Sequence, residues 1–288
     1  MEKPNHVDCI ETLRGRCQQN MPTLLGIPLD VNSSYLRGAA AAPGKIREAL
    51  LCDASNNWTE LGVDLGTAGA FSDTGDLRLS NSREKVGDDF AEIERAVADL
   101  LKKGACPVSL GGDHSVTYPI LKAFAGRYPE LTIVHFDAHP DLYDEFEGSR
   151  VSHACPFARI MEEHLAKRLV QVGIRTMNGH QREQAARFGV EVSEMRALPA
   201  HDKLKINGPV YISFDIDVLD PAFAPGISHR EPGGMTVREA IAHLHAIEGT
   251  IVGADLVEYN PAQDVSGMTA TVAAKILKEI LGKMIPEK

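Results

Sequence analysis

Apolar residues recur along the chain in two patterns that alternate. Short, mostly apolar runs, such as those at 131–136 and 209–214, are typical of strands buried on both faces. Between such runs, apolar residues repeat at spacings of three and four, as they do from Val86 to Leu100, and this predicts amphipathic helices. The predicted strands are 23–28, 107–110, 131–136, 169–172, 209–214 and 251–256; the other predicted helices are 43–50, 115–124, 157–167, 180–188, 236–247 and a C-terminal helix with Ala273, Leu277, Leu281 and Met284 on one stripe.

Strands and helices therefore alternate along the chain, which is typical of crossover units and a parallel sheet. We expect an α/β fold of three layers, with helices on both faces of one parallel β-sheet. The sequence shows no composition break, repeat or linker, so residues 1–288 are predicted to form a single domain, with 1–22 as an N-terminal extension. The polar segment 53–83 is predicted to be a surface connection with at most one strand.

Composition and charge exclude several classes of protein. Apolar residues make up 43% and charged residues 24%, as in ordinary globular proteins. The net charge of −10 repels a phosphate backbone, so we expect no nucleic-acid partner. No apolar run is long enough to span a membrane. Five cysteines without a CxxC pair indicate reduced thiols, and the acid-containing N-terminus lacks an apolar targeting segment, so we expect a cytoplasmic protein.

Metal-ligand residue types directly follow three of the predicted strands. The segments are GGDHS at 111–115, DAHPD at 137–141 and DID at 215–217. The ligand site of an open parallel sheet lies beyond the C-terminal ends of its strands, which is where these segments fall. One GGDH alone could be a turn with a helix cap. Three ionisable groups spaced by two, as in DAHPD, would project to one side of an extended segment and repel one another without a counter-charge. Together the three segments predict a metal site.

Charge counting favours two divalent cations at this site. Four carboxylates carry −4, which two such cations balance, and two imidazoles can bind as neutral ligands. A carboxylate-rich set suits Mn²⁺ better than a metal that prefers thiolates. Two-metal sites hold their ions roughly 3.5–4 Å apart and generate a hydroxide nucleophile near neutral pH, so we expect hydrolysis at a planar carbon or at phosphorus. The predicted ligands are His114, Asp137, His139, Asp141, Asp215 and Asp217.

In four segments the chain resembles the ureohydrolases, the family of arginase, agmatinase and their relatives. The segments are GGDHS, DAHPD, SFDIDVLDP and GADLVEYNP, in the family's order, and the resemblance extends from about Leu24 to Met284. It implies an arginase-like single α/β domain, usually in trimers or hexamers, that releases urea from a small guanidinium compound at two Mn²⁺ ions per chain. One implied ligand set is His114, Asp137, Asp141 and Asp215, and the other is Asp137, His139, Asp215 and Asp217.

The resemblance also implies roles beside the metals. His153 corresponds to a mobile histidine that transfers a proton to the leaving amine, as an imidazole that titrates near neutrality can. Glu258 corresponds to the carboxylate that binds the planar guanidinium in a paired, charge-assisted contact. Asp141 joins them as a catalytic residue. The loop after Asp141 is expected to surround the rest of the substrate through Tyr143, Ser149 and Ser152.

The substrate is harder to predict, because arginine and agmatine share the guanidinium group. Loop 142–152 lacks the Asn, Ser and Thr content of animal-type arginases, and Tyr143 with three acids favours a cationic amine such as agmatine. Other segments, at 32–38, 143–148, 152–154 and 228–234, are similar to plant-type arginases. The charge of Arg150 or Arg230 could attract a carboxylate. We predict hydrolysis of L-arginine to L-ornithine and urea, with agmatine (giving putrescine) or another guanidino acid as the alternative.

Two further classes compete with this interpretation. A deacetylase-like enzyme of related fold would hold one zinc with two aspartates and one histidine, fewer ligands than the sequence provides. An inactive regulatory paralogue would need a lost ligand, and all six predicted ligands are present.

Overall fold

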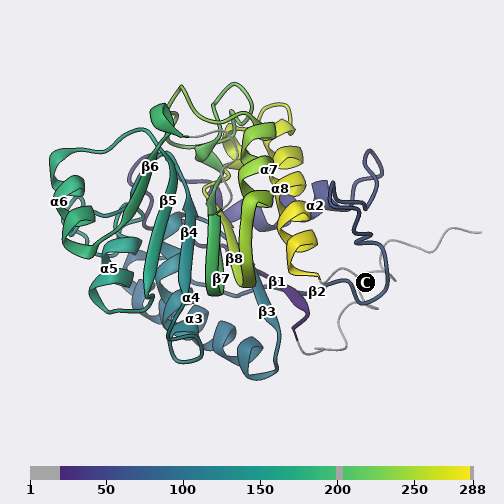
Figure 1. The fold of residues 1–288 in the computed structure, drawn as a ribbon, viewed down its shortest axis with the longest axis horizontal. Coiled ribbons are helices and arrows are strands. Elements are labelled where there is room, and N and C mark those ends of the chain that lie inside the picture. Colours follow the sequence, from purple (N-terminus) through teal and green to yellow (C-terminus); the bar gives the residue numbers. More distant parts are fainter. Residues whose placement is uncertain (1–19, 199–203, 286–288) are drawn as a thin grey trace, which may run out of the picture.

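The strands form one parallel sheet. The structure, a computed structural model, describes residues 20–198 and 204–285. Its sheet has eight strands in the order β2-β1-β3-β8-β7-β4-β5-β6, and every neighbouring pair is parallel, which confirms the predicted fold class (Figure 1). The strands are β1 (Pro22–Gly26), β2 (Ser72–Asp76), β3 (Cys106–Leu110), β4 (Thr132–Phe136), β5 (Arg168–Ile174), β6 (Glu191–Glu194), β7 (Leu204–Asp215) and β8 (Ile247–Val257).

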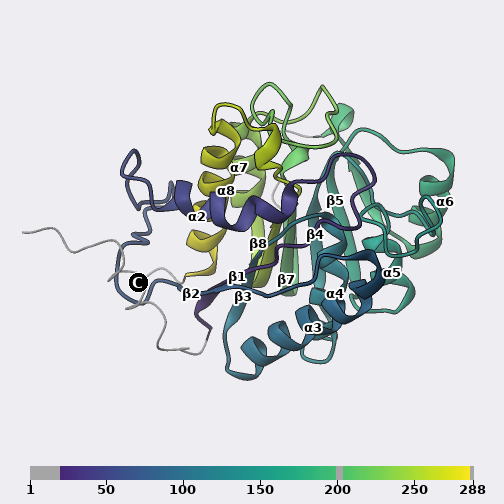
Figure 2. The same ribbon diagram turned by 180° about the vertical axis from the view of Figure 1, so that it is seen from behind.

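Helices cover both faces of the sheet. Helices α2, α7 and α8 pack on one face and α3 to α6 on the other (Figures 1 and 2). Alternate residues of a strand enter the two cores: Val134 of β4 belongs to the first and Ile133 to the second. The helices are α2 (Ala42–Leu50), α3 (Val86–Lys102), α4 (Thr117–Ala125), α5 (Pro156–Glu162), α6 (Gly179–Phe188), α7 (Val237–Ala246) and α8 (Met268–Met284).

Several element boundaries differ from the predictions. Strand β6 was not predicted, because its residues at the sheet edge are mostly polar and form no apolar run. The helix expected at 157–167 ends at Glu162, and His164 adopts a left-handed φ of 55°. Strands β7 and β8 begin earlier than expected, because their first residues mix polar and apolar side chains and form no apolar run. The predicted extension 1–22 lies mostly outside the described residues, and its last residue, Pro22, already begins β1. A single domain over 1–288 stays a prediction.

The chain order of the strands creates a switch point in the middle of the sheet. Strands β3 and β4 are consecutive in sequence, yet β8 and β7 lie between them. The four neighbours β3-β8-β7-β4 all end at the same edge, and each is followed by residues of the predicted site. This is where open α/β sheets bind ligands. Within the described residues, no helix is long and apolar enough to cross a membrane.

Gly112 permits a close approach of backbone at this edge. The amide of the next residue, Asp113, donates to the carbonyl of Leu29 at 2.8 Å, and the carbonyl of Gly112 accepts from the amide of Glu258 at 2.9 Å. A Cβ atom at Gly112 would lie 1.8 Å from the Leu29 oxygen. Only glycine therefore lets the turn after β3 join the loops after β1 and β8.

Replacing Gly112 by alanine should destabilise the protein by about 3 kcal/mol or more, because the clash is with backbone that cannot rotate away. Urea unfolding measures this loss. Gly126→Ala is the matched control, since a Cβ there meets nothing within 4 Å. Equal unfolding free energies for the two variants would show that the turn tolerates a side chain.

Candidate active site

His114 forms the centre of a first group of candidate ligands. Its side chain is fully buried, and Nδ1 lies 3.2 Å from an oxygen of Asp137 and 3.1 Å from oxygens of Asp141 and Asp215. Nδ1 nevertheless makes no hydrogen bond to any residue that the structure describes. An orphaned imidazole nitrogen that faces three carboxylate oxygens fits a cation between them, since an unpaired buried polar atom is otherwise costly. We call these four residues the first half-site.

His139 forms a second group on the other side of Asp137. Its Nδ1 lies 3.0 Å from Asp217 Oδ2 and 3.4 Å from Asp137 Oδ1. The ligand atoms of Asp137, His139 and Asp217 all lie within 4.8 Å of one another, and these residues are the second half-site. Asp137 thus belongs to both half-sites, with Oδ2 toward His114 and Oδ1 toward His139. The structure brings all six predicted ligands together.

The DAHPD segment reaches this geometry by bending, which corrects the expectation of an extended segment. Strand β4 ends at Phe136, and the amide of His139 turns back to donate to Asp137 Oδ1 at 2.5 Å. Asp141 has a left-handed φ of 48°, and this conformation accompanies its return to His114. The third segment turns in a similar way, because the amide of Asp217 donates to Asp215 Oδ1 at 2.8 Å.

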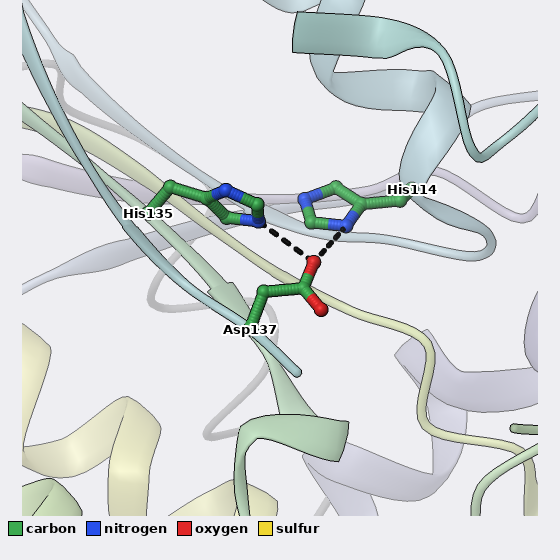
Figure 3. Close-up of side chains that lie close together, drawn as sticks. All are labelled: His114, His135 and Asp137. Atoms are coloured by element: carbon green, nitrogen blue, oxygen red, sulfur yellow. Dashed lines mark hydrogen bonds and ion pairs between the residues drawn. The ribbon is translucent and has the colours of Figure 1, made fainter. Parts of the chain in front are cut away.

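His135 is a residue of the site that the sequence reasoning missed. Its Nε2 lies 2.7 Å from the same Asp137 oxygen that faces His114 (Figure 3). Gln171 Nε2 bonds both the Pro140 carbonyl and His135 Nδ1, so Nδ1 accepts and Nε2–H donates to Asp137. His135 therefore orients Asp137. Its place two residues before Asp137, on the same strand face, was a signal that could have found it.

A second chain of hydrogen bonds fixes the ring of His114. The Ser213 hydroxyl donates to buried Asp255 at 2.7 Å, so it accepts from His114 Nε2 at 3.0 Å. Asp255 also accepts hydrogen bonds from Tyr211 (2.8 Å) and Thr117 (2.9 Å). With the proton held at Nε2, the lone pair of Nδ1 is directed at the three carboxylates. This is the tautomer in which Nδ1 can bind a metal.

The charges of the cluster shift the pKa values of its members. Burial lowers the pKa of His114, but Asp137, Asp141 and Asp215 outweigh it and raise that pKa well above its ordinary value. Burial and the neighbouring carboxylates Asp217 and Asp137 raise the pKa of Asp215 well above its usual range. Protons and cations therefore compete for the same excess of negative charge.

His153 and Glu258 form a buried pair beside the half-sites. His153 Nδ1 lies 2.8 Å from Glu258 Oε1, which also accepts from the backbone amide of His114 at 2.8 Å. Although burial opposes the shift, the Glu258 carboxylate raises the pKa of His153 to about 9. The imidazolium in turn lowers the pKa of Glu258, again against burial. The pair joins a proton donor to a carboxylate that can bind a cation.

This pair and both half-sites open into one cavity of about 150 Å³. Tyr143 lies in the wall of this cavity, and its hydroxyl accepts from Asn178 Nδ2 at 2.7 Å. Ser34 and His229 also line the cavity, although the sequence reasoning gave them no role. The predicted site residues in the wall are His139, Asp141, Tyr143, His153, Asp215, Asp217 and Glu258.

A second cavity of about 260 Å³ shares Ser34 and Phe146 with the first. Ser149 and Ser152 line this second cavity, together with the oppositely charged Arg83 and Glu147. The two arginines predicted to attract a carboxylate have other partners. Arg150 is paired with Asp144 (2.7 Å) and Glu162 (2.8 Å), and Arg230 donates to Pro225 O and Gln263 Oε1.

Comparison with known proteins agrees with this geometry. The family model described as "Arginase family" matches residues 21–282. The chain belongs to the arginase family. Arginase 1, mitochondrial, of Arabidopsis thaliana is 46% identical over 276 residues, which cover 91% of this chain and 80% of that protein. The agmatinase of Bacillus subtilis (strain 168) is 38% identical over 264 residues, 90% of each.

The solved structure of arginase from Medicago truncatula superposes with a TM-score of 0.87 at 44% identity, and covers 92% of this chain and 87% of that one. The chain is therefore an arginase-family ureohydrolase, a metal-dependent hydrolase. These matches confirm the predicted resemblance to the ureohydrolases. Enzymes of this fold act on small guanidino substrates and are generally oligomeric.

The shared position of Asp137 generates a thermodynamic prediction. A divalent cation at 100 times its Kd should stabilise the metal-free protein by about 2.7 kcal/mol, because it binds the folded state alone. Asp137→Asn should abolish most of the cation-induced rise in Tm. Asp99→Asn, at an exposed acid of α3, is the control and should keep the full rise. A full rise in the Asp137 variant would show that this carboxylate binds no cation.

Proposed function

We propose that this ureohydrolase cleaves L-arginine to L-ornithine and urea at a binuclear manganese centre. One Mn²⁺ would be held by His114, Asp137, Asp141 and Asp215, and the other by Asp137, His139, Asp215 and Asp217, so Asp137 and Asp215 would contribute to both. The observation that carries the proposal is the pair of half-sites that share Asp137 beside Glu258. Oxygen ligands with two imidazoles suit Mn²⁺.

The proposed chemistry divides between the metals and the chain. When bound, the two cations supply a hydroxide nucleophile from water near neutral pH. Glu258 binds the guanidinium and holds its central carbon within the cavity. In the metal-free protein burial lowers the pKa of His153, but Glu258 outweighs it and raises that pKa to about 9. His153 transfers a proton to the amine nitrogen as the C–N bond breaks. Asp141 lines the same cavity, where its carboxylate accepts a proton from the attacking water.

The second cavity supports arginine over agmatine. Arginine differs from agmatine by an α-carboxylate beside the α-ammonium, so its tail needs both a cation and an anion. Arg83 and Glu147 supply these charges in the wall of the second cavity, where Ser149 and Ser152 add hydroxyls. This cavity shares Ser34 and Phe146 with the first.

The acids of loop 142–152, which alone favoured agmatine, are partly neutralised. Asp144 is paired with Arg150 and Arg159, each at 2.7 Å, and these arginines lower the pKa of its carboxyl. Agmatine and other guanidino acids remain the alternative substrates, which the relationship to an agmatinase favours. An inactive regulatory paralogue is disfavoured because no ligand is missing.

Steady-state kinetics on Mn²⁺-loaded protein test the proposal. Arginine should exceed agmatine in kcat/KM by tenfold or more, about 1.4 kcal/mol of transition-state discrimination. A tenfold preference for agmatine would make the enzyme an agmatinase. Metal analysis accompanies the assay: about two Mn per active chain is expected, whereas one Zn or no urea from any guanidinium compound would contradict the proposal.

Arg83→Ala should raise the KM for arginine by about tenfold or more, as expected when a charge-assisted contact worth about 1.5–3 kcal/mol is lost, and should leave the KM for agmatine unchanged. Lys85→Ala is the control, because Lys85 is an exposed cation in the same turn and lies outside the wall of the cavity. An equal effect of Arg83→Ala on both substrates would place the carboxylate elsewhere.

We also propose that the protein is a cytoplasmic homotrimer or homohexamer. The proposed assembly is supported by the fact that enzymes of this fold are generally oligomeric. Cys52, Cys106 and Cys155 are free thiols, as expected of a reducing compartment, while Cys9 and Cys17 lie outside the described residues. The Arabidopsis relative is named mitochondrial, so fractionation of the native cell is the direct test of location.

A further inference from the structure

Ser34 holds the side of the His153 ring that faces away from Glu258. Its hydroxyl lies 2.8 Å from His153 Nε2, and its backbone amide donates a hydrogen bond to the same nitrogen at 3.2 Å. The hydroxyl also lies 3.4 Å from His229 Nε2, so it sits between two imidazoles in the cavity wall. Both nitrogens of His153 therefore have a partner, Glu258 at Nδ1 and Ser34 at Nε2.

We propose that Ser34 is a positioning residue that keeps the His153 ring aligned on the leaving nitrogen while the substrate occupies Glu258. The inference rests on the proposed roles of His153 and Glu258. A guanidinium that binds Glu258 competes with His153 for the same carboxylate. The contact at Nδ1 then weakens, and the contact at Nε2 is the one that still fixes the ring.

The segment that carries Ser34 is anchored to the turn that carries His114. The amide of Asn32 donates to Asp113 Oδ2 at 2.9 Å, and Asn32 Nδ2 donates to Ser115 Oγ at 2.9 Å. The carbonyl of Asn32 accepts from the amide of His153 at 3.3 Å. The same GGDHS turn therefore fixes the positions of both the His153 ring and the first half-site. Proton transfer needs such a fixed distance between the donor and the reacting atoms.

The adjacent serine offers a matched comparison. Ser33 is 5% exposed, and its hydroxyl has no hydrogen-bond partner. Ser33 lines the second cavity, so its replacement can affect substrate binding. Loss of its hydroxyl removes the same atom type, one residue away, without removing a contact to His153. A difference between Ser34→Ala and Ser33→Ala isolates the hydrogen bond from any general effect of the substitution on this segment.

The experiment is a double-mutant cycle between Ser34 and His153, measured with the better guanidinium substrate. Ser34→Ala should lower kcat about tenfold and change KM less than threefold, with metal content unchanged, because a contact to a catalytic group is lost. Ser34→Thr keeps the hydroxyl and should recover most of kcat, and Ser33→Ala should keep kcat within twofold of wild type, whatever its effect on KM. In the His153→Ala background, Ser34→Ala should have no further effect.

Three results would overturn the proposal: a kcat within twofold of wild type for Ser34→Ala, an equal loss of kcat with and without His153, or a rise in KM alone, which would make Ser34 a substrate contact. These outcomes are distinct from failure of the proposed function. A substrate other than arginine changes the assay but not the cycle, whereas an enzyme without guanidinium hydrolysis fails before the cycle begins.

Discussion

Asp137 is fully buried, and its two oxygens face two different imidazoles at the end of a central strand. Three further carboxylates approach the same point from DAHPD and from the end of β7. So many negative charges in a buried site repel one another strongly, and only protons or cations relieve the repulsion. The close backbone approach at Gly112 and the switch point in the sheet both serve to bring these groups together.

The groups around the carboxylates are arranged to direct lone pairs inward. His135 donates to Asp137 and is itself fixed by Gln171, while Ser213 and Asp255 hold the proton of His114 on the side away from the carboxylates. These contacts choose one tautomer for each ring before any ligand arrives. The repulsion between these buried carboxylates lowers the stability of the metal-free fold, and the hydrogen bonds from the orienting partners offset part of that cost.

The sequence was sufficient to predict a parallel sheet and most of its helices, and to place the six candidate ligands at one edge of that sheet, because these predictions depend on local apolar pattern and on where the strands end. The polar edge strand β6 and the end of α5 at Glu162 escaped the same reasoning, because no apolar run marks the strand and no capping signal marks the end of the helix. The sequence did not predict the conformation of Asp141, because no local signal indicated its left-handed φ. Ser34 and His153 are 119 residues apart, so their contact depends on how two loops meet. The same holds for Arg83, which reaches the second cavity from a turn that the sequence pattern left as surface.

The central claim is that two cations share Asp137, and anomalous X-ray diffraction from a crystal of the Mn²⁺-loaded protein tests it most directly. Two anomalous peaks per chain are expected, roughly 3.5–4 Å apart, one on each side of the Asp137 carboxylate. A single fully occupied peak at His114, with Asp137 and Asp217 bound to no second ion, would contradict it.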